Sequence, residues 1–336
     1  MSGRSLPYDL LLAKTKARLG SLPEPSAIIV KEGDHFELQN QEKGLLPYLF
    51  VRNLGFGGSA AVEMVQDINT GSVYARKIFR NVYTRNLEKV KHDFQNELNV
   101  MHRLAAHHHI IRVFATYIAQ RELALILNPV ADDGDLASFL QIYQDAGCSD
   151  ARHTEKTAIL YRAIGCLASG LSFMHKQRVR HKDIKPQNVL IHRGAIIYTD
   201  FGISFDFHQN NQSTTTGTPQ SYTKKYCAPE VADWGNRNSK SDIFSLGCVY
   251  IEMLAAIDSN IFAETFLENP DPYWVKANQI AWPSICNAVD EFSEWILGVI
   301  HTMLQSNPKD RPVSYELVNK IKKDHWDFKL FCESCF

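Results

Sequence analysis

Hydrophobic residues in the first part of the chain occur in short runs separated by turn residues, a pattern that predicts β-strands. The expected strands are 48–54, 60–67, 72–79, 113–118 and 123–127. The first three follow one another through short turns, which predicts an antiparallel meander. Between the third and fourth strands, Phe94, Leu98 and Met101 recur at helical spacing, so a helix is expected at 88–104.

From about residue 135 onward the apolar residues recur every three or four positions, as on the buried face of a helix. The expected helices are 136–144, 154–176, 240–257, 291–304 and 315–323. A small β-rich half therefore precedes a larger α-rich half, with the connection near residues 129–134, and the predicted fold class is α+β. Residues 1–44 are expected to form an N-terminal extension with a short helix, a loop rich in Pro and Ser, and a short strand at 27–30.

Composition narrows the class of protein without naming a function. The chain has 336 residues, of which 45% are hydrophobic and 22% charged, and these fractions exclude a collagen-like, coiled-coil or wholly disordered chain. Its length corresponds to about two domains or one large bilobal unit. With 36 basic and 37 acidic side chains the net charge is −1, so we expect neither nucleic acid nor an anionic membrane surface as a partner.

We expect no signal peptide and no membrane span. The apolar run at 10–13 is too short for the core of a signal peptide. The longest apolar stretch, 243–257, contains Ser245 and Glu252 and is shorter than the roughly 20 residues that cross a bilayer, so it is expected to be a buried core helix. The odd number of cysteines, seven, favours reduced thiols over a disulfide framework and places the protein in the cytoplasm or the nucleus.

A glycine-rich turn and a lysine in the third strand are the first candidates for chemistry. The turn at 55–59 reads Gly-Phe-Gly-Gly-Ser, and glycines let backbone amides approach phosphate oxygens, although an ordinary hairpin turn remains an alternative. A dinucleotide-binding turn is excluded because no helix begins here and Ala60 replaces its third glycine. Lys77 lies in an apolar strand; it is either a surface lysine or an inward one, which would need a partner such as Glu97.

A third region decides between these interpretations. Residues 181–188 read His-Lys-Asp-Ile-Lys-Pro-Gln-Asn and are followed by Asp-Phe-Gly at 200–202 and Ala-Pro-Glu at 228–230. With the glycine-rich turn and the strand lysine, these motifs stand in the order typical of eukaryotic protein kinases, which the chain resembles over about 48–323. The resemblance implies a bilobal kinase fold, with a small antiparallel-sheet N-lobe carrying one helix and a larger, mainly helical C-lobe.

The resemblance also implies boundaries. They are an extension at 1–44, a kinase domain at 45–325 with an N-lobe at 45–130 and a C-lobe at 131–325, and a C-terminal tail at 326–336.

Catalytic roles follow from the same resemblance. Phosphoryl transfer passes through a loose transition state, so that catalysis depends on positioning and charge. Lys77 would bind the α- and β-phosphates and be held by Glu97, while Asp183 would orient the attacking hydroxyl and accept its proton. Lys185 would neutralise charge on the transferring phosphoryl group, and Asn188 would complete the catalytic set.

ATP and Mg²⁺ are the implied cofactors. Asp200 and Asn188 are the expected metal ligands, since both offer the oxygen atoms that Mg²⁺ prefers. Pro129 keeps its carbonyl and Ala131 its amide, so both can bind adenine, and Asn128 is the gatekeeper-like residue before them. The full set expected to bind ATP is Leu54, Gly55, Phe56, Gly57, Gly58, Ser59, Val62, Ala75, Lys77, Asn128, Pro129, Ala131, Leu190 and Asp200.

Acceptor type and regulation can be argued from the segment around these motifs. Lys185 with Thr223 resembles the serine/threonine kinases rather than the tyrosine kinases. Six hydroxyl residues between 213 and 221 are either sites of regulatory phosphorylation or part of a solvated linker. Lys182 replaces the arginine that is usual before the catalytic aspartate, which predicts a weaker clamp on a phosphorylated loop because lysine lacks the bidentate fork.

Two structural roles are also implied. Asp242 is expected to anchor the backbone of the catalytic loop, and Arg311 is expected to form a buried ion pair with Glu230.

Two motifs contain residue types that bind metals. Cys332 and Cys335 form a Cys-x-x-Cys near the C-terminus, but no second pair accompanies them in the sequence, so we interpret them as a chance pair at a frayed end. The run His107, His108 and His109 matches a loop that often holds histidine in protein kinases, and we interpret it as an ordinary loop.

The predicted function is that of a serine/threonine protein kinase, transferring the γ-phosphoryl group of ATP to protein hydroxyls. A pseudokinase or scaffold without turnover is the alternative, and a small-molecule kinase is a third. Asp135 stands where some kinases read upstream arginines, whereas Gln187 replaces a glutamate of those kinases, so only a mild basic preference is expected. The combination of 129–132 with 181–183 is similar to kinases of filamentous fungi.

Overall fold

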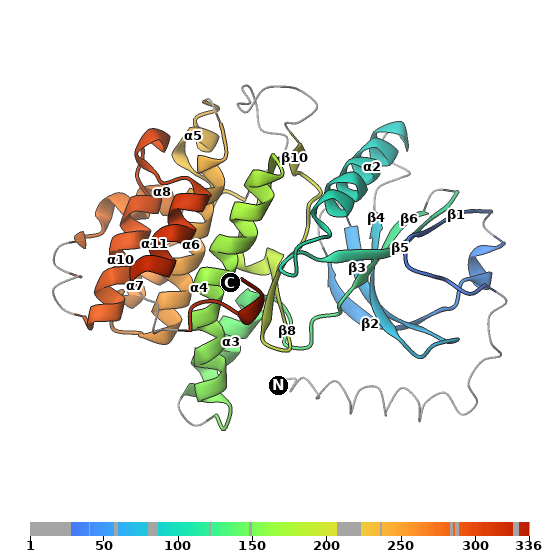
Figure 1. Cartoon of the computed structure of the whole chain (residues 1–336), viewed down its shortest axis with the longest axis horizontal. Coiled ribbons are helices and arrows are strands. Elements are labelled where there is room, and N and C mark those ends of the chain that lie inside the picture. The colour runs from blue at the N-terminus through green and yellow to red at the C-terminus, as the bar shows by residue number, and fades with distance from the viewer. Residues whose placement is uncertain are drawn as a thin grey trace. The chain divides into compact units, whose positions relative to one another are not determined.

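The computed structural model of the chain (Figure 1) describes residues 28–39, 41–56, 60–79, 87–120, 122–147, 150–206, 223–235, 237–282, 285, 289–324 and 329–335. The chain divides into two compact units. Unit 1 comprises Met1–Ala105 and Ile111–Asp132, and unit 2 comprises Ala106–Ile110 and Asp133–Phe336. The short histidine-containing segment Ala106–Ile110 therefore belongs with the C-terminal part of the chain, although it lies within the sequence of unit 1.

Unit 1 is built on a six-stranded sheet with the strand order β1-β5-β6-β4-β3-β2. The strands are β1 (Asp34–Leu38), β2 (Tyr48–Phe56), β3 (Ala60–Asp67), β4 (Val73–Phe79), β5 (Arg112–Ala119) and β6 (Glu122–Asn128). The five strands predicted from the apolar runs are all confirmed, and the neighbours among them pair antiparallel. The expected meander of β2, β3 and β4 is therefore present.

The first strand differs from the prediction in place and in direction. The strand predicted at 27–30 is wrong, since residues 28–30 form no strand and β1 begins at Asp34. β1 pairs in parallel with β5, so the sheet is mixed rather than purely antiparallel. Its sequence, DHFEL, contains two apolar residues and gives a weak strand signal. The run before it is apolar for another reason, because Val30 belongs to the buried core cluster that includes Tyr74 and Tyr117.

Among the described residues of unit 1, one long helix accompanies this sheet, as predicted. It is α2 (Leu87–Leu104), which also follows the expected bounds closely. Phe94, Leu98 and Met101 are buried on one side of α2, at the helical spacing visible in the sequence. Glu97 is buried on the same helix and is only 1% exposed, so a carboxylate from α2 enters the interior of unit 1.

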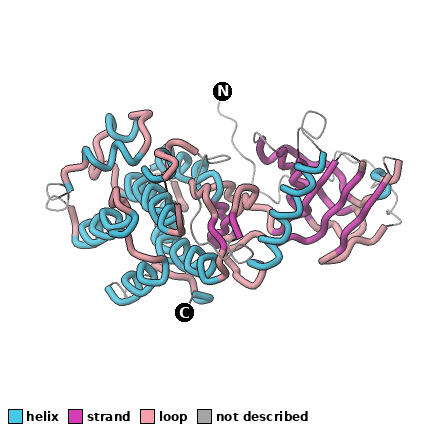
Figure 2. Tube along the Cα trace, turned by 90° about the horizontal axis from the view of Figure 1, so that it is seen from above, coloured by secondary structure: helices cyan, strands magenta, loops and turns pink. Residues whose placement is uncertain are grey.

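Unit 2 is mainly helical, as Figure 2 shows by its predominance of cyan tube. Its helices are α3 (Leu136–Ala146), α4 (His153–Lys176), α5 (Pro229–Ala232), α6 (Lys240–Ile257), α7 (Glu264–Glu268), α8 (Tyr273–Lys276), α10 (Glu291–Met303) and α11 (Ser314–Asp324). Short 3-10 helices occur at Pro186–Asn188, Ala277–Gln279, Pro308–Asp310 and Glu333–Cys335. The five helices predicted from the periodicity are confirmed. Two of them begin with an aspartate that caps the first turn. Asp135 accepts from the Ser138 amide, and Asp290 accepts from the Phe292 and Ser293 amides.

Two short strand pairs in unit 2 carry the loops that matter for function. β8 (Val189–His192) pairs with β9 (Ala195–Tyr198), and β7 (Val179–Arg180) pairs with β10 (Phe205–Asp206). β7 and β8 flank the loop at 181–188, and β9 and β10 flank the loop at 199–204. The two strand pairings therefore fix the ends of both loops next to each other. A fold with a mixed six-stranded sheet in its N-terminal part and a helical C-terminal part agrees with the predicted bilobal kinase fold, apart from the parallel β1.

Among the described residues, one helix, α4, has the length and the apolar composition of a membrane span. Of that apolar stretch, 61% is buried inside the protein, as expected for the core helix of a folded unit. The longest apolar run in the sequence lies in α6, where Ile243, Phe244 and Leu246 are fully or almost fully buried. Helix α6 is therefore the buried core helix that the sequence predicted.

Candidate active site

A buried carboxylate, that of Asp242, holds the backbone at the start of the loop at 181–188. Asp242, in the first turn of α6, accepts hydrogen bonds from the backbone amides of His181 at 3.0 Å and Lys182 at 2.9 Å. The ring of His175 lies 3.0 Å from the same carboxylate. Burial alone would raise the pKa of Asp242, but the hydrogen bond from His175, the neighbouring imidazoles and the loop amide hold it below its ordinary value. The expected anchoring role of Asp242 is confirmed.

The carboxylate of Asp183 is the centre of a compact hydrogen-bonded group. Thr223 Oγ1 donates to Asp183 Oδ1 at 2.6 Å, and Asn188 Nδ2 donates to Asp183 Oδ2 at 3.0 Å. Lys185 Nζ lies 2.7 Å from Asp183 Oδ2 and donates to Thr223 Oγ1 at 2.9 Å. Three side chains that the sequence singled out, Lys185, Asn188 and Thr223, are thus brought together around one carboxylate. A fixed carboxylate beside a fixed ammonium group can accept a proton and stabilise negative charge in the same place.

The Asp-Phe-Gly segment at 200–202 begins beside this group because of the strand pairing that precedes it. The Thr199 amide donates to the carbonyl of Asn188 at 3.0 Å, which extends the pairing of β8 and β9. Asp200 adopts a positive φ of 63°, and Phe201 is fully buried with its ring centroid 5.0 Å from that of His181. Since the amide nitrogen of Asn188 donates to Asp183, the amide oxygen of Asn188 remains an acceptor.

In unit 1 the strand lysine points inward and forms an ion pair. Lys77 on β4 is 7% exposed, and its Nζ lies 2.6 Å from Oε1 of Glu97 on α2. The alternative of an ordinary surface lysine is therefore wrong. Lys77 pairs in register with Val62 on β3 and with Leu125 on β6, so it occupies a central strand of the sheet.

The residues expected around the nucleotide lie on the strands as the sequence placed them. Leu54, Gly55 and Phe56 are on β2, with Gly55 opposite Val62. Ala75 is on β4, Asn128 ends β6, and Pro129 and Ala131 follow it; the bond between Asn128 and Pro129 is cis. Leu190 lies on β8 in unit 2 and forms a bridge with Asp135. Gly57, Gly58 and Ser59 lie outside the described residues, as do the six hydroxyl residues between 213 and 221.

The Ala-Pro-Glu motif ends in a second buried ion pair, as predicted. Arg311 donates to Glu230 through both of its terminal nitrogens, at 2.7 and 2.8 Å, and the guanidinium side chain is fully buried. Ser241 Oγ also donates to Glu230 at 2.8 Å. The sequence did not indicate Ser241 or His175 as supporting residues, because each acts on a partner far along the chain and belongs to no local motif.

Basic side chains lie in the catalytic loop and next to it in the sequence. Burial, and next the charge of Arg180, lowers the pKa of Lys182 to about 8. Arg180 is 2% exposed and donates to the carbonyl of Arg237 at 2.7 Å. Lys225, which follows Thr223 by two residues, forms an ion pair with Glu252 at 2.7 Å.

Comparison with known proteins agrees with these geometries. Residues 48–326 match the protein kinase domain family. The chain is similar to serine/threonine-protein kinase cds1 of Schizosaccharomyces pombe, with 30% identity over 276 residues that cover 79% of this chain and 55% of that protein.

Two further relatives are similar over comparable lengths. The cAMP-dependent protein kinase catalytic subunit of the same yeast is 27% identical over 256 residues, or 76% of this chain and 45% of that protein. Mitogen-activated protein kinase kinase 2 of Arabidopsis thaliana is 25% identical over 347 residues, or 97% of this chain and 85% of that protein. The chain spans about half the length of the two yeast relatives. The comparisons do not confirm the expected likeness to kinases of filamentous fungi.

Proposed function

The chain belongs to the protein kinase family, and from this membership we propose that it is an ATP-dependent serine/threonine protein kinase, which transfers the γ-phosphoryl group to protein hydroxyls. The observation that carries the proposal is the group of Asp183, Lys185, Asn188 and Thr223 in unit 2. These side chains are joined to one another by hydrogen bonds and an ion pair, which fixes their positions. Such preorganisation is what a reaction governed by positioning and charge requires.

Asp183 is the proposed catalytic base. Thr223 and Asn188 hold its carboxylate from two sides, which fixes the direction in which it can accept a proton from a serine or threonine hydroxyl. Lys185 places positive charge next to it, where negative charge on the transferring phosphoryl group would be stabilised. The contact between Lys185 and Thr223 supports a serine/threonine acceptor, since this pair carries the resemblance to serine/threonine kinases.

ATP and Mg²⁺ are the proposed cofactors. Asp200 and Asn188 would hold the metal through oxygen atoms, and the orientation of the Asn188 amide, with its nitrogen engaged by Asp183, fits that role. When bound, Mg²⁺ supplies charge neutralisation for the phosphates. Lys77, fixed by Glu97, would bind the α- and β-phosphates, and the residues of β2, β3, β4 and the 128–131 segment would bind the rest of the nucleotide.

The alternatives are less well supported. A pseudokinase usually lacks one of the groups that bind metal or accept the proton, whereas Lys77, Glu97, Asp183, Asn188 and Asp200 are all present here. A small-molecule kinase does not need a platform, that is, a surface on which a peptide substrate binds. The anchoring of the Ala-Pro-Glu motif by Arg311 supports such a platform, and protein substrates are therefore the proposed partners.

We propose a mild preference for basic residues upstream of the acceptor. The preference rests on Asp135, whose carboxylate is fixed at the start of α3 by hydrogen bonds from the amide and the hydroxyl of Ser138. For location, we propose the cytoplasm or the nucleus, where thiols stay reduced, in keeping with the free thiols of Cys166, Cys227 and Cys248.

The test is a phosphotransfer assay with the purified full chain, ATP, Mg²⁺ and a generic basic protein as acceptor. Wild type should incorporate phosphate on serine or threonine, while Asp183→Asn and Lys77→Met should lose at least about 100-fold in rate. Asp271→Asn and Lys323→Met are the matched controls, since both residues are exposed and outside the proposed site. Equal incorporation by wild type and the two site variants would refute the proposed enzyme.

A further inference from the structure

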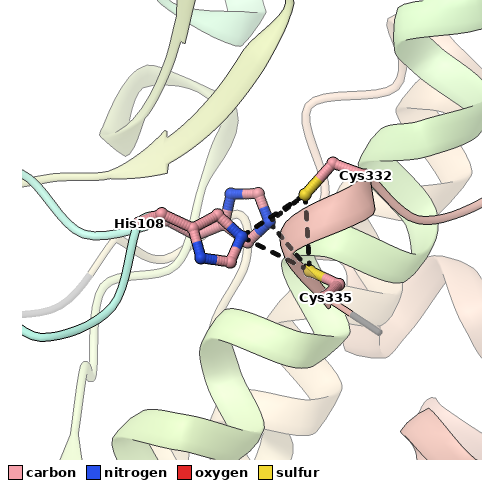
Figure 3. Close-up of side chains that lie close together, drawn as sticks. His108, Cys332 and Cys335 are labelled. Carbon is pink, nitrogen blue, oxygen red and sulfur yellow. Dashed lines mark hydrogen bonds between the residues drawn. The ribbon is translucent and has the colours of Figure 1, made fainter.

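The C-terminal cysteine pair and the histidine run meet in unit 2, which corrects the sequence interpretation of both. His108 and His109 lie within the Ala106–Ile110 segment, and Cys332 and Cys335 lie at the other end of the chain (Figure 3). The labelled side chains of His108, Cys332 and Cys335 point toward one another from two different segments. A separation of 224 residues between His108 and Cys332 is the reason that the sequence pattern alone did not connect the two motifs.

The four potential ligand atoms lie close together. His109 Nε2 is 3.1 Å from Cys335 Sγ and 3.5 Å from Cys332 Sγ, while His108 Nε2 is 3.3 Å from Cys332 Sγ and 3.6 Å from Cys335 Sγ. The two sulfurs are 3.6 Å apart, and no two of the four ligand atoms are more than 4.8 Å apart. They therefore enclose a space the size of a single ion.

These separations match the edges of a tetrahedron around zinc. With Zn–S bonds of about 2.3 Å and Zn–N bonds of about 2.0–2.1 Å, the ligand atoms should be about 3.8 Å apart for two sulfurs and about 3.6 Å apart for a sulfur and a nitrogen. The observed 3.6 Å between the sulfurs and 3.1–3.6 Å between sulfur and nitrogen are within about half an ångström of those values. A disulfide requires a sulfur separation of about 2.05 Å, which the 3.6 Å between Cys332 and Cys335 exceeds by far.

The ring of His109 is also oriented as a metal ligand requires. Its Nδ1 lies 2.6 Å from the carbonyl oxygen of Ile196 and must donate its proton there, because a carbonyl oxygen only accepts. The proton on Nδ1 leaves Nε2 with a lone pair, directed at the two sulfurs. A hydrogen bond from the second ring nitrogen to a backbone carbonyl is typical of metal-bound histidine.

Helix α4 contacts both the C-terminal tail and the histidine segment. The amide of Gly165 on α4 donates to the carbonyl of Leu330 at 3.0 Å, and a Cβ at Gly165 would overlap that carbonyl oxygen. Five residues further along α4, a Cβ at Gly170 would lie 3.3 Å from Cβ of His109. The tail and the histidine segment thus approach α4 where glycine leaves room for them. Cys332 is further fixed by its amide, which donates to the sulfur of Cys166 at 3.3 Å.

We propose that His108, His109, Cys332 and Cys335 bind one Zn²⁺ ion, which fastens the C-terminal tail to the histidine segment of unit 2. All four tetrahedral positions are filled by protein side chains, so the site is structural and leaves no position for a substrate. Thiolate and imidazole ligands distinguish it from the oxygen ligands proposed for Mg²⁺. The cysteines lie beyond residue 326, where the match to the kinase domain family ends, so the clamp is an addition to that domain.

The test measures metal in the purified full-length protein by plasma mass spectrometry. We expect about one zinc per chain in wild type and in His102→Ala, an exposed histidine at the end of α2 that serves as the matched control. The Cys332→Ser/Cys335→Ser variant and His109→Ala should retain less than about one tenth of that zinc. Cys248→Ser, at a buried cysteine outside the cluster, should keep the full amount.

A second measurement does not depend on the folding of any variant. Wild-type protein is stripped with a chelator under reducing conditions and loaded with Co²⁺, whose visible absorption between about 600 and 750 nm is intense in a tetrahedral site with thiolate ligands. One equivalent of Co²⁺ should produce this absorption, and Zn²⁺ should remove it. Protein that takes up neither ion, that carries a Cys332–Cys335 disulfide by mass, or that holds as much zinc in the double serine variant as in wild type would overturn the proposal.

Discussion

Removal of the Arg311 side chain should destabilise the protein strongly. Arg311 has five N–H donors, and all five are used: two bonds reach Glu230, and one each reaches the carbonyls of Gln305, Lys240 and Ser306. Arg311→Ala would leave the Glu230 carboxylate, which is 10% exposed, with the Ser241 hydroxyl as its one remaining side-chain donor among the described residues. Breaking such a pair costs about 3–5 kcal/mol, because the remaining charge is left uncompensated.

The assay is equilibrium unfolding in urea, followed by circular dichroism. We expect Arg311→Ala to lower the free energy of unfolding by about 4 kcal/mol, and Arg311→Lys by about 2 kcal/mol, since lysine keeps the charge but cannot bind both carboxylate oxygens and the three carbonyls. The matched control is Lys320→Ala. Lys320 forms an exposed pair with Asp324 at 3.0 Å, and its loss should change stability by less than about 0.5 kcal/mol.

The comparison of Arg311→Ala with Lys320→Ala tests whether burial of the ion pair is the cause of the large loss of stability. If Arg311→Ala were as stable as Lys320→Ala, the free energy of the pair would not depend on its burial, and the reasoning would be wrong. A double variant, Arg311→Met with Glu230→Gln, provides a further check: it should be more stable than Arg311→Met alone, because no unpaired charge remains.

Three further changes test other parts of the structure. Thr223→Ala should lower kcat about 10- to 100-fold in the phosphotransfer assay with little change in KM for ATP, because it removes the donor to Asp183, and Thr223→Ser should restore most of the rate. Since burial lowers the pKa of Lys182 from 10.5 to about 8, its charge costs stability below about pH 8 and the cost disappears as the pH rises to 10.5. Because Lys182 is exposed and solvent screens its charge, Lys182→Met should be only slightly more stable than wild type in urea at pH 7, by at most about 1 kcal/mol, and a difference that does not shrink by pH 10 would contradict this. Gly165→Val should displace Leu330 and weaken zinc binding at least 10-fold with all four ligands intact, measured by competition with a metal indicator; unchanged affinity would show that α4 does not position the tail.

Most of the fold could be predicted from the sequence because its signals are local. Five strands and six long helices follow from the spacing of apolar residues, and each is confirmed close to its expected ends. β1 could not be predicted, because an edge strand with two apolar residues depends on pairing with β5 for its structure. The ion pair of Lys77 with Glu97 was one of two alternatives that the residues left open, and the order of the kinase motifs favoured it, although twenty residues separate the partners.

The candidate catalytic residues were predictable for a related reason. Asp183, Lys185 and Asn188 lie within six positions of one another, so a single loop conformation brings them together. Thr223 joins them from 40 residues away, and only the resemblance indicated it. For the cysteine–histidine cluster, the sequence contains two separate motifs but nothing that connects them. Its two halves are brought together by α4, and a glycine in a helix gives no sequence signal for what it contacts.

The two sites nevertheless share a structural element. The carbonyl of His109 accepts from the amide of Tyr198 at 2.8 Å, and its ring donates to the carbonyl of Ile196, so the histidine segment adds hydrogen bonds to β9. β9 leads directly to Asp200, the proposed metal ligand of the active site. The other edge of β9 pairs with β8 over four residues, which keeps the strand in place independently of the tail. The proposed zinc clamp therefore contributes mainly to the stability of unit 2, and its histidine segment adds hydrogen bonds to β9, the strand that precedes Asp200.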